Sequence, residues 1–367
     1  MQNTNNQTNI VEASKQAARD AGLTYVSDGQ PGISRKRRGK NSFNYTDASG
    51  KRVSDEETLY RIKLLAIPPA WTDVWIARSD RGHVQAIGRD ARKRKQYRYH
   101  SKWREVRDET KYGRLLAFAK VLPAIRKRVH RDLAKKGLPR EKVLATVIAV
   151  MEKTFIRVGN DEYARTNDSF GLTTLQDRHV RVKRGSSKVV FEFRGKSGKD
   201  HAIELTDPRL ARVVAQSQDL PGQELFQYLD DEGKVCDIGS ADVNEYLRDV
   251  SGQDFTAKDF RTWAGTVLAA TALGELEAFE SNAQAKKNIV SAVERVAERL
   301  GNTKAVCRKC YIHPEVFSAY LDKSMIEAVK QRAAAVGKDL SKLKPEEAAV
   351  VALLRRRLAS DSRSTKR

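Results

Sequence analysis

Four residues between positions 157 and 311 have the types and the spacing for chemistry on a phosphodiester. Arg157 follows an apolar stretch in "FIRVGNDEYA", Lys196 lies in the glycine-flanked turn of "FEFRGKSGKDH", and Arg261 lies in the apolar helical pattern "AKDFRTWAGT". Tyr311 ends "NTKAVCRKCY". A phenol can attack phosphorus, two guanidiniums can hold the non-bridging oxygens, and a lysine can protonate the leaving oxygen. Each residue alone is weak evidence, because a buried arginine more often pairs with a structural carboxylate, but the set favours this reaction.

The two cysteines before Tyr311 raise the alternative of a metal site. Cys307 and Cys310 have C-x-x-C spacing, and His313 follows them. A structural zinc ion needs four ligands, so Cys236 would have to come from a distant segment, and the two cations between the cysteines would repel the metal. A redox pair lacks the βαβ context of thioredoxin-like proteins. We therefore interpret the pair as small residues that pack between helices.

Other cofactors find no support in the sequence. It contains no G-x-x-x-x-G-K-[ST] loop for nucleotide phosphates, and its six histidines lack metal-ligand spacing. The acidic clusters at 55–57 and 230–232 are typical of helix caps and turns, not of a two-metal nuclease. We therefore predict a reaction that uses neither a metal nor a nucleotide cofactor.

The charge of the chain indicates its partner. The 367 residues carry 69 Lys and Arg against 47 Asp and Glu, a formal net charge of +22. Nucleic acid is the commonest large polyanion in a cell, and an anionic membrane surface is the alternative. The stretch "GRDARKRKQYRYHSKW" (88–103) interleaves cations with Tyr97, Tyr99 and Trp103, which suits contacts with phosphate and sugar. The other interpretation of this stretch is a solvated charge run with incidental aromatics.

The sequence carries no signal for a membrane or for secretion. No apolar run approaches the ~18–20 residues needed to span a bilayer. The polar N-terminus lacks the apolar stretch of a signal peptide, and three cysteines are too few for a secreted disulfide framework. We expect a cytoplasmic, nucleoid-associated protein that binds nucleic acid and not a membrane.

The elements that must position these residues predict an α+β fold. We expect a flexible lead-in over 1–22, a small β-rich DNA-binding domain over 23–103, a mainly helical catalytic domain with a small β-sheet over 104–340, and a C-terminal helix with a basic tail over 341–367. Alternating residues on both sides of turn sequences predict hairpins over 42–53 and 73–88, after a basic loop over 34–41. Three- and four-residue apolar spacing predicts helical segments over 102–120, 122–136 and 140–155.

At its candidate reactive residues the sequence resembles the type IB DNA topoisomerases, especially the compact bacterial enzymes that are similar to those of poxviruses. The family's catalytic arginine lies in an "R-[IV]-G" stretch, here Arg157, and its catalytic lysine in a "G-K" turn, here Lys196. Its second arginine lies in "D-[LF]-R-T", here Arg261. The nucleophile lies nine residues after a polar residue that follows glycine, here Tyr311 after Asn302.

The resemblance extends over about residues 22–330 and also implies contacts with DNA. "QYRY" matches the family's DNA-facing "QYxY" and implies that Gln96, Tyr97 and Tyr99 bind DNA, and "IRVGNDEYARTNDSFGLTTL" implies the same of Tyr163. The family's fold implies that the two domains close as a clamp around duplex DNA. We expect the chain to act on double-stranded DNA as a monomer.

The resemblance implies ATP-independent relaxation of supercoiled DNA. Tyr311 would form a 3′-phosphotyrosyl link and leave a free 5′-hydroxyl, the broken strand would swivel, and the hydroxyl would attack back. Arg157, Arg261 and Asn302 would stabilise the charged phosphorane, and Lys196 would be the general acid.

One departure and two alternatives accompany this interpretation. Most of the superfamily has histidine where this chain has Asn302, which can donate or accept a hydrogen bond but cannot carry charge. A tyrosine recombinase shares the chemistry but normally has H-x-x-R at the second arginine, where this chain has Lys258 three residues before Arg261. A non-catalytic nucleoid protein would explain the charge but not the spaced reactive residues.

Overall fold

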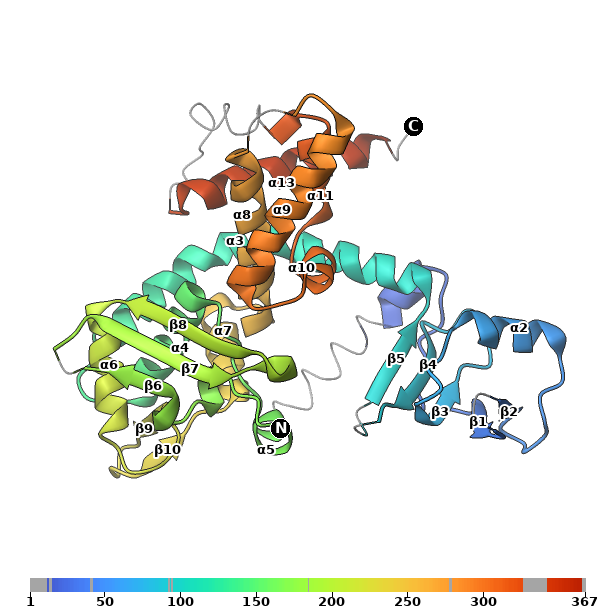
Figure 1. Cartoon of the computed structure of the whole chain (residues 1–367), viewed down its shortest axis with the longest axis horizontal. Coiled ribbons are helices and arrows are strands. Elements are labelled where there is room, and N and C mark those ends of the chain that lie inside the picture. The colour runs from blue at the N-terminus through green and yellow to red at the C-terminus, as the bar shows by residue number, and fades with distance from the viewer. Residues whose placement is uncertain are drawn as a thin grey trace. The chain divides into compact units, whose positions relative to one another are not determined.

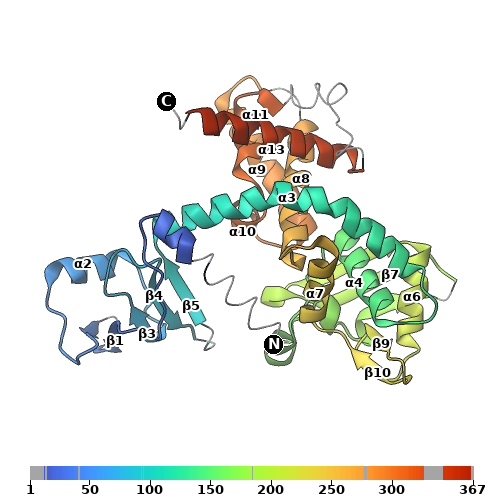
Figure 2. The same cartoon turned by 180° about the vertical axis from the view of Figure 1, so that it is seen from behind.

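The computed structural model describes most of the chain, which is drawn in Figures 1 and 2. The described residues are 12, 15–39, 42–91, 93, 95–183, 185–276, 279–325 and 342–364, without the side chains of 104–113, 197 and 358–364. They belong to two compact units, unit 1 up to Gly113 and unit 2 from Arg114 onward. Most of the expected lead-in and the last residues of the expected basic tail lie outside the described residues.

Unit 1 is built on a five-stranded antiparallel sheet with the strand order β2-β1-β3-β4-β5. Its elements are β1 (Ile33–Arg37), β2 (Phe43–Thr46), α2 (Glu56–Leu64), β3 (Thr72–Ile76), β4 (Val84–Arg89) and β5 (Lys95–Tyr99). The hairpin predicted over 73–88 is confirmed as β3 and β4. The side-chain amide of Gln85 donates to three carbonyl groups of its turn. The core of the unit includes Ile33, Ile62, Val74, Ile76 and Ala86.

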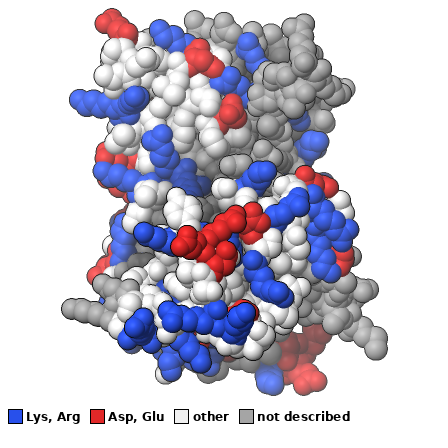
Figure 3. Space-filling view, turned by 90° about the vertical axis from the view of Figure 1, so that its right-hand side faces the viewer, with Lys and Arg blue, Asp and Glu red and all other residues white. Residues whose placement is uncertain are grey.

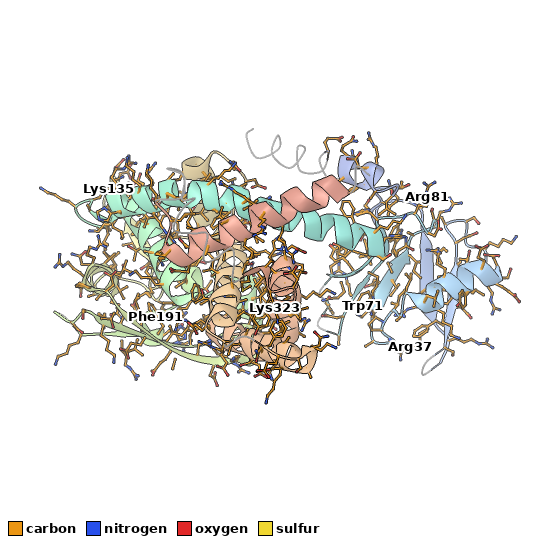
Figure 4. All side chains as sticks on the ribbon, turned by 90° about the horizontal axis from the view of Figure 1, so that it is seen from above. Arg37, Trp71, Arg81, Lys135, Phe191 and Lys323 are labelled. Carbon is orange, nitrogen blue, oxygen red and sulfur yellow. The ribbon has the colours of Figure 1, made fainter. Side chains whose placement is uncertain are left out.

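The basic stretch 34–41, which we expected to be a loop, instead contributes most of β1, paired with β2. The guanidinium of Arg35 lies 4.1 Å from the centroid of the Phe43 ring. It also donates to the carbonyl oxygens of Pro68 and Trp71 at 3.0 and 2.8 Å, and Trp71 is labelled in Figure 4. Arg35 thus stabilises the fold, a role that composition does not distinguish from that of an exposed charge.

Helix α3 (Ser101–Leu133) is continuous where the sequence predicted two segments. Pro123 lies inside it, although proline removes one backbone hydrogen bond and disfavours a helix interior. Apolar side chains are buried on both sides of the proline: Leu115, Phe118, Leu122, Ile125 and Val129. Burial of this continuous face offsets the cost of the proline. The expected domain boundary at 103/104 and the division at 113/114 both fall within α3.

The first part of unit 2 packs helices on a three-stranded antiparallel sheet of order β6-β7-β8. Its elements are α4 (Arg140–Thr154), α5 (Asp161–Asn167), η1 (Leu172–Thr174), η2 (Asp177–His179), β6 (Val180–Val182), β7 (Lys188–Arg194), η3 (Lys196–Gly198), β8 (Asp200–Thr206), α6 (Pro208–Gln218), β9 (Gln227–Leu229), β10 (Val235–Asp237) and α7 (Ser240–Ser251). α4 is central, because it contacts α6, α7, β8 and β9 (Figure 2). Phe191 of β7, labelled in Figure 4, is fully buried.

The second part of unit 2 is helical. Its elements are α8 (Ala257–Gly274), α9 (Asn282–Leu300), α10 (Lys304–Cys310), α11 (Pro314–Leu321) and α13 (Pro345–Ser364). α8 packs against α9, α11 and α13 (Figure 1). The buried carboxylate of Glu347 in α13 accepts two hydrogen bonds from Arg126 of α3, at 2.8 and 2.7 Å, and one from Trp263 of α8 at 3.2 Å. α13 is therefore tied to the helix that carries Arg261.

The observed elements confirm the predicted α+β class, with a β-rich N-terminal unit followed by a mainly helical unit that contains a small sheet. None of the helices in the described ranges combines the length and the apolar character that crossing a membrane requires.

Candidate active site

Arg261 is the most enclosed of the predicted catalytic residues, with 5% of its surface exposed. Its Nη1 donates to the carbonyl oxygen of Phe155, which caps the C-terminus of α4. Its Nη2 donates at 2.7 Å to the carbonyl oxygen of Leu300, the last residue of α9. The C-terminus of a helix carries partial negative charge and unsatisfied carbonyl groups. Among the described residues, two helix ends and no carboxylate therefore hold this guanidinium in place.

The start of α8 determines where Arg261 lies along that helix. Thr256 precedes the helix, and its backbone N–H and hydroxyl donate to the carboxylate of Asp259 at 2.8 and 3.0 Å. This capping contact determines where the helix begins. Phe260 and Trp263 flank Arg261 and are buried, so the same apolar face that packs the helix carries the cation.

Arg157 lies in a short segment after α4, and backbone contacts with η1 hold this segment in place. The N–H of Leu172 in η1 donates to the carbonyl oxygen of Arg157 at 2.9 Å. A Cβ on Gly171 would lie 2.6 Å from that oxygen, so glycine is needed for the close approach of the two segments. The guanidinium of Arg157 donates to Oδ1 of Asn302.

Asn302 follows the C-terminus of α9. Gly301 takes the left-handed conformation with φ 60°, and the N–H of Asn302 donates to the carbonyl oxygen of Ala297 at 2.9 Å. This arrangement is a usual end of a helix. While Oδ1 accepts from Arg157, Nδ2 of Asn302 is buried and has no hydrogen-bond partner among the described residues.

Tyr311 caps the C-terminus of α10 and lies against α8. Its N–H donates to the carbonyl oxygen of Cys307 at 3.0 Å, and its own carbonyl oxygen accepts from the hydroxyl of Thr266 at 3.3 Å. A Cβ on Gly265 would lie 2.6 Å from that carbonyl oxygen and 3.0 Å from Cβ of Tyr311. The guanidinium carbon of Arg261 lies 5.3 Å from the centroid of the phenol ring. The predicted nucleophile and the predicted second arginine are thus neighbours.

The electrostatics of the site favour an anion. The described part of the chain contains no carboxylate partner for Arg157 or Arg261. Burial and then the charge of Arg261 lower the pKa of Arg157 to about 10, so the guanidinium of Arg157 stays charged at neutral pH. Nε of Arg261, like Nδ2 of Asn302, is a buried donor without a partner in this part of the chain. A bound phosphate would supply both the missing charge and the missing acceptors.

Lys196 is placed differently from the other four. It begins η3 at the tip of the β7–β8 hairpin, and its side chain is exposed. Within the described residues its ammonium makes no hydrogen bond or ion pair, so the structure brings Arg157, Arg261, Asn302 and Tyr311 together but not Lys196. A cavity of about 450 Å³ separates the hairpin from the ends of α4 and α9, and its lining includes Arg157, Gly195, His201 and Gly301.

The residues predicted to bind DNA in unit 1 lie on β5. Tyr97 and Tyr99 share one face of the strand, and their rings stack with centroids 5.7 Å apart. Tyr97 is 43% exposed. Gln96 is on the opposite face, where its amide donates to the carboxylate of Asp90 at 3.0 Å. Tyr97 therefore presents an exposed ring that is backed by the half-buried Tyr99, whereas Gln96 is engaged within the protein.

Tyr163, the predicted DNA contact in unit 2, is on α5 and is 39% exposed. The side chain of Asn160 caps this helix by accepting from the N–H of Tyr163 at 3.0 Å. On the face of the molecule drawn in Figure 3, Lys and Arg side chains are widely spread, and the acidic side chains form more compact groups.

The Cys-x-x-Cys pair lies next to Tyr311 on α10. Cys307 is buried, and its burial raises the pKa of the thiol to about 11. His313 is engaged as a helix cap, because its Nδ1 accepts from the N–H of Glu315 at 3.1 Å. Within the described ranges no group of three or more His, Cys, Asp or Glu could hold a metal ion. A reaction without cofactors stays a prediction.

Sequence reasoning missed three residues of this site: His201, Gly265 and Thr266. Gly265 and Thr266 are part of the stretch "AKDFRTWAGT", from which the sequence analysis selects only Arg261. A glycine inside a helical pattern can mark a close approach of another backbone, so that signal was available. His201 follows Lys196 by five residues, and nothing in the sequence indicates what its ring contacts.

Comparison with known proteins gives two matches to family models and several similar viral proteins. Residues 100–340 match the eukaryotic DNA topoisomerase I catalytic core, and residues 42–90 match the bacterial DNA topoisomerase IB N-terminal domain. The chain is 32% identical over 288 residues to DNA topoisomerase 1B of Acanthamoeba polyphaga mimivirus, which covers 77% of this chain and 85% of the viral one. It is 21% identical over 286 residues to DNA topoisomerase 1B of Vaccinia virus (strain Copenhagen), covering 76% and 87%.

Proposed function

Because the chain belongs to the type IB DNA topoisomerases and relaxes supercoiled DNA, we propose that Tyr311 is its nucleophile. The phenol oxygen attacks phosphorus, the bond between phosphorus and the 5′-oxygen breaks, and a 3′-phosphotyrosyl link and a 5′-hydroxyl result. The broken strand swivels, and the hydroxyl attacks the link to restore the strand. The link retains the energy of the phosphodiester, so no ATP is needed.

Arg157, Arg261 and Asn302 hold the phosphate during both steps. One observation carries this assignment. Within the described residues, the guanidiniums of Arg157 and Arg261 have no carboxylate partner, and Nε of Arg261 and Nδ2 of Asn302 are buried donors without an acceptor. Buried donors nearly always have a hydrogen-bond acceptor, and like charges repel each other. Without an anion, this arrangement of donors and guanidiniums therefore costs free energy. Donors that are already in place stabilise the extra charge of the phosphorane without reorganisation.

Lys196 is the general acid that protonates the 5′-oxygen as it leaves. Its exposed position at the tip of a hairpin suits a residue that reaches its substrate only when DNA is bound. Active-site contacts are often loose without substrate and tighten in the complex.

Duplex DNA contacts both units in this proposal. Tyr97, Tyr99 and Tyr163 offer aromatic surface, and Gln96 belongs to the same strand as the first two. The net charge of +22 supplies attraction to the phosphates. The chain acts as a monomer that closes around the duplex, in the cytoplasm and on the nucleoid.

The test of the nucleophile is Tyr311→Phe. This change removes one oxygen from the reaction and almost nothing from the binding surface. We expect duplex binding to stay close to that of the wild type, while relaxation of a supercoiled plasmid without ATP or magnesium is lost. Covalent capture of labelled DNA after denaturation measures the adduct directly.

Tyr60→Phe is the matched control, because Tyr60 is 64% exposed on α2 in unit 1. It should relax DNA like the wild type. A denaturant-resistant adduct formed by Tyr311→Phe would mean that another residue is the nucleophile.

A further inference from the structure

The ring of His201 lies between the two segments that carry Lys196 and Asn302. His201 is the second residue of β8 and pairs with Phe193 of β7, and their rings stack with centroids 5.1 Å apart. The imidazole therefore sits one residue pair before the turn that carries Lys196.

Two glycines make room for this ring. A Cβ on Gly195 would lie 2.6 Å from Cδ2 and Nε2 of His201, and a Cβ on Gly301 would lie 2.5 Å from Cε1. Real side chains do not approach so closely, so both backbones contact the imidazole directly. Gly195 immediately precedes Lys196, and Gly301 immediately precedes Asn302. One ring thus touches the backbone next to each of these two residues.

The surroundings of the ring favour its neutral form. Burial, and then the charges of Arg157, Lys199 and Arg261, lower the pKa of His201, while Asp200 acts in the opposite direction. A neutral ring can fill the space between two backbones without adding a third positive charge beside the two guanidiniums.

We propose that His201 is a positioning residue for cleavage, whose ring docks the Lys196 hairpin against the end of α9. The argument rests on the proposed role of Lys196 as general acid. Among the described residues, the ammonium of Lys196 makes no hydrogen bond or ion pair that fixes it in the site, so its distance from the leaving oxygen depends on how the hairpin is held. The contact of the ring with Gly195 and Gly301 links the hairpin directly to the end of α9, next to Asn302. A second link runs through Phe170, whose N–H donates to the carbonyl oxygen of Arg194, but it reaches the segment of Arg157 and not α9.

The test compares two DNA substrates in single-turnover cleavage by His201→Ala and Lys196→Ala. Ordinary DNA needs a proton on the leaving 5′-oxygen, whereas a 5′-bridging phosphorothiolate leaves as a thiolate that needs none. Small misplacements of reacting groups can cost about 100-fold in rate, so we expect His201→Ala to slow cleavage of ordinary DNA roughly 10–100-fold. The phosphorothiolate should restore most of the lost rate for both variants.

The outcomes distinguish an error in the positioning role of His201 from an error in the general-acid role of Lys196. If the phosphorothiolate rescues Lys196→Ala but not His201→Ala, or if His201→Ala cleaves ordinary DNA at the wild-type rate, the positioning role is wrong. If Lys196→Ala itself is not rescued, Lys196 is not the general acid and the proposed function needs revision. His130→Ala, at an exposed histidine of α3, is the matched control and should cleave both substrates like the wild type.

A double-mutant cycle tests the contact itself. Gly195 has φ −99°, a conformation that alanine adopts readily, so Gly195→Ala acts mainly through the collision of its methyl group with the ring. It should slow cleavage in the wild type but change it less than about twofold in the His201→Ala background, because contacting residues are not additive. Equal effects of Gly195→Ala in both backgrounds would overturn the proposal even if His201→Ala alone were poorly folded.

Discussion

Asn302 joins the site through two different atoms, which makes its contribution testable at the scale of one residue. Oδ1 accepts from Arg157, and Nδ2 is a buried donor without a partner among the described residues. If Nδ2 donates to a non-bridging oxygen of the phosphate, Asn302→Ala should cost about 2.7–4 kcal/mol, the range for one oxyanion-hole donor. We therefore expect single-turnover cleavage to slow about 10²–10³-fold.

Two further substitutions at this position distinguish a donor from a mere helix-end residue. Asn302→Asp keeps the shape but replaces the donor by an anion that would pair with Arg157, so it should be at least as slow as Asn302→Ala. Asn302→His should retain substantial activity, because an imidazole N–H can donate to a similar oxygen. It should also gain a rate dependence near pH 6–7, since the unperturbed pKa of histidine is about 6.5. An alanine variant as fast as the wild type would reduce Asn302 to the residue that follows Gly301.

At the scale of elements, the approach of α10 to α8 places the nucleophile. Gly265 has no side chain, and the backbone of Tyr311 occupies the space that a Cβ would need. Gly265→Ala should therefore displace Tyr311 while removing no reacting group, and a displacement of about 1 Å can cost roughly 100-fold in rate. We expect slower cleavage with nearly unchanged DNA affinity, measured by single-turnover kinetics and equilibrium binding.

Gly274→Ala provides the matched control for this prediction. Gly274 ends the same helix, and a Cβ there would meet nothing within 4 Å. Both substitutions should favour the helix slightly through backbone entropy, so their difference isolates the contact with Tyr311. Equal cleavage rates for the two variants would show that α10 can shift without consequence.

The elements also show what the sequence could and could not predict. The order of Arg157, Arg261 and Tyr311 along the chain was sufficient to select residues that the structure brings together. The sequence could not show that two helix C-termini hold Arg261, because that depends on where α4 and α9 end in space. The same limit applies to α3, where the sequence predicted two segments: the helix is continuous through Pro123 and buries apolar side chains on both sides of it.

For the whole molecule, the relevant property is the net positive charge, which is not confined to a single site. Several cations have structural roles: Arg126 pairs with two carboxylates, and Arg35 binds carbonyl groups of its own unit. These arginines cannot also neutralise DNA phosphates. The net charge of +22 nevertheless remains after every acidic residue is counted against a basic one. Binding to duplex DNA should therefore involve several phosphates at once.

This excess of positive charge predicts that DNA binding depends steeply on salt concentration. Each neutralised phosphate releases condensed counterions, so the logarithm of the binding constant should fall linearly with the logarithm of salt concentration. For ~5–8 phosphate contacts the slope should be about −4 to −7. Measurement on Tyr311→Phe avoids covalent capture and reports binding alone. Lys188→Ala is a suitable control, because Lys188 is paired with Glu204 at 2.5 Å and its loss should leave the slope unchanged. A nearly flat dependence in Tyr311→Phe would mean that the charge serves a partner other than the DNA backbone.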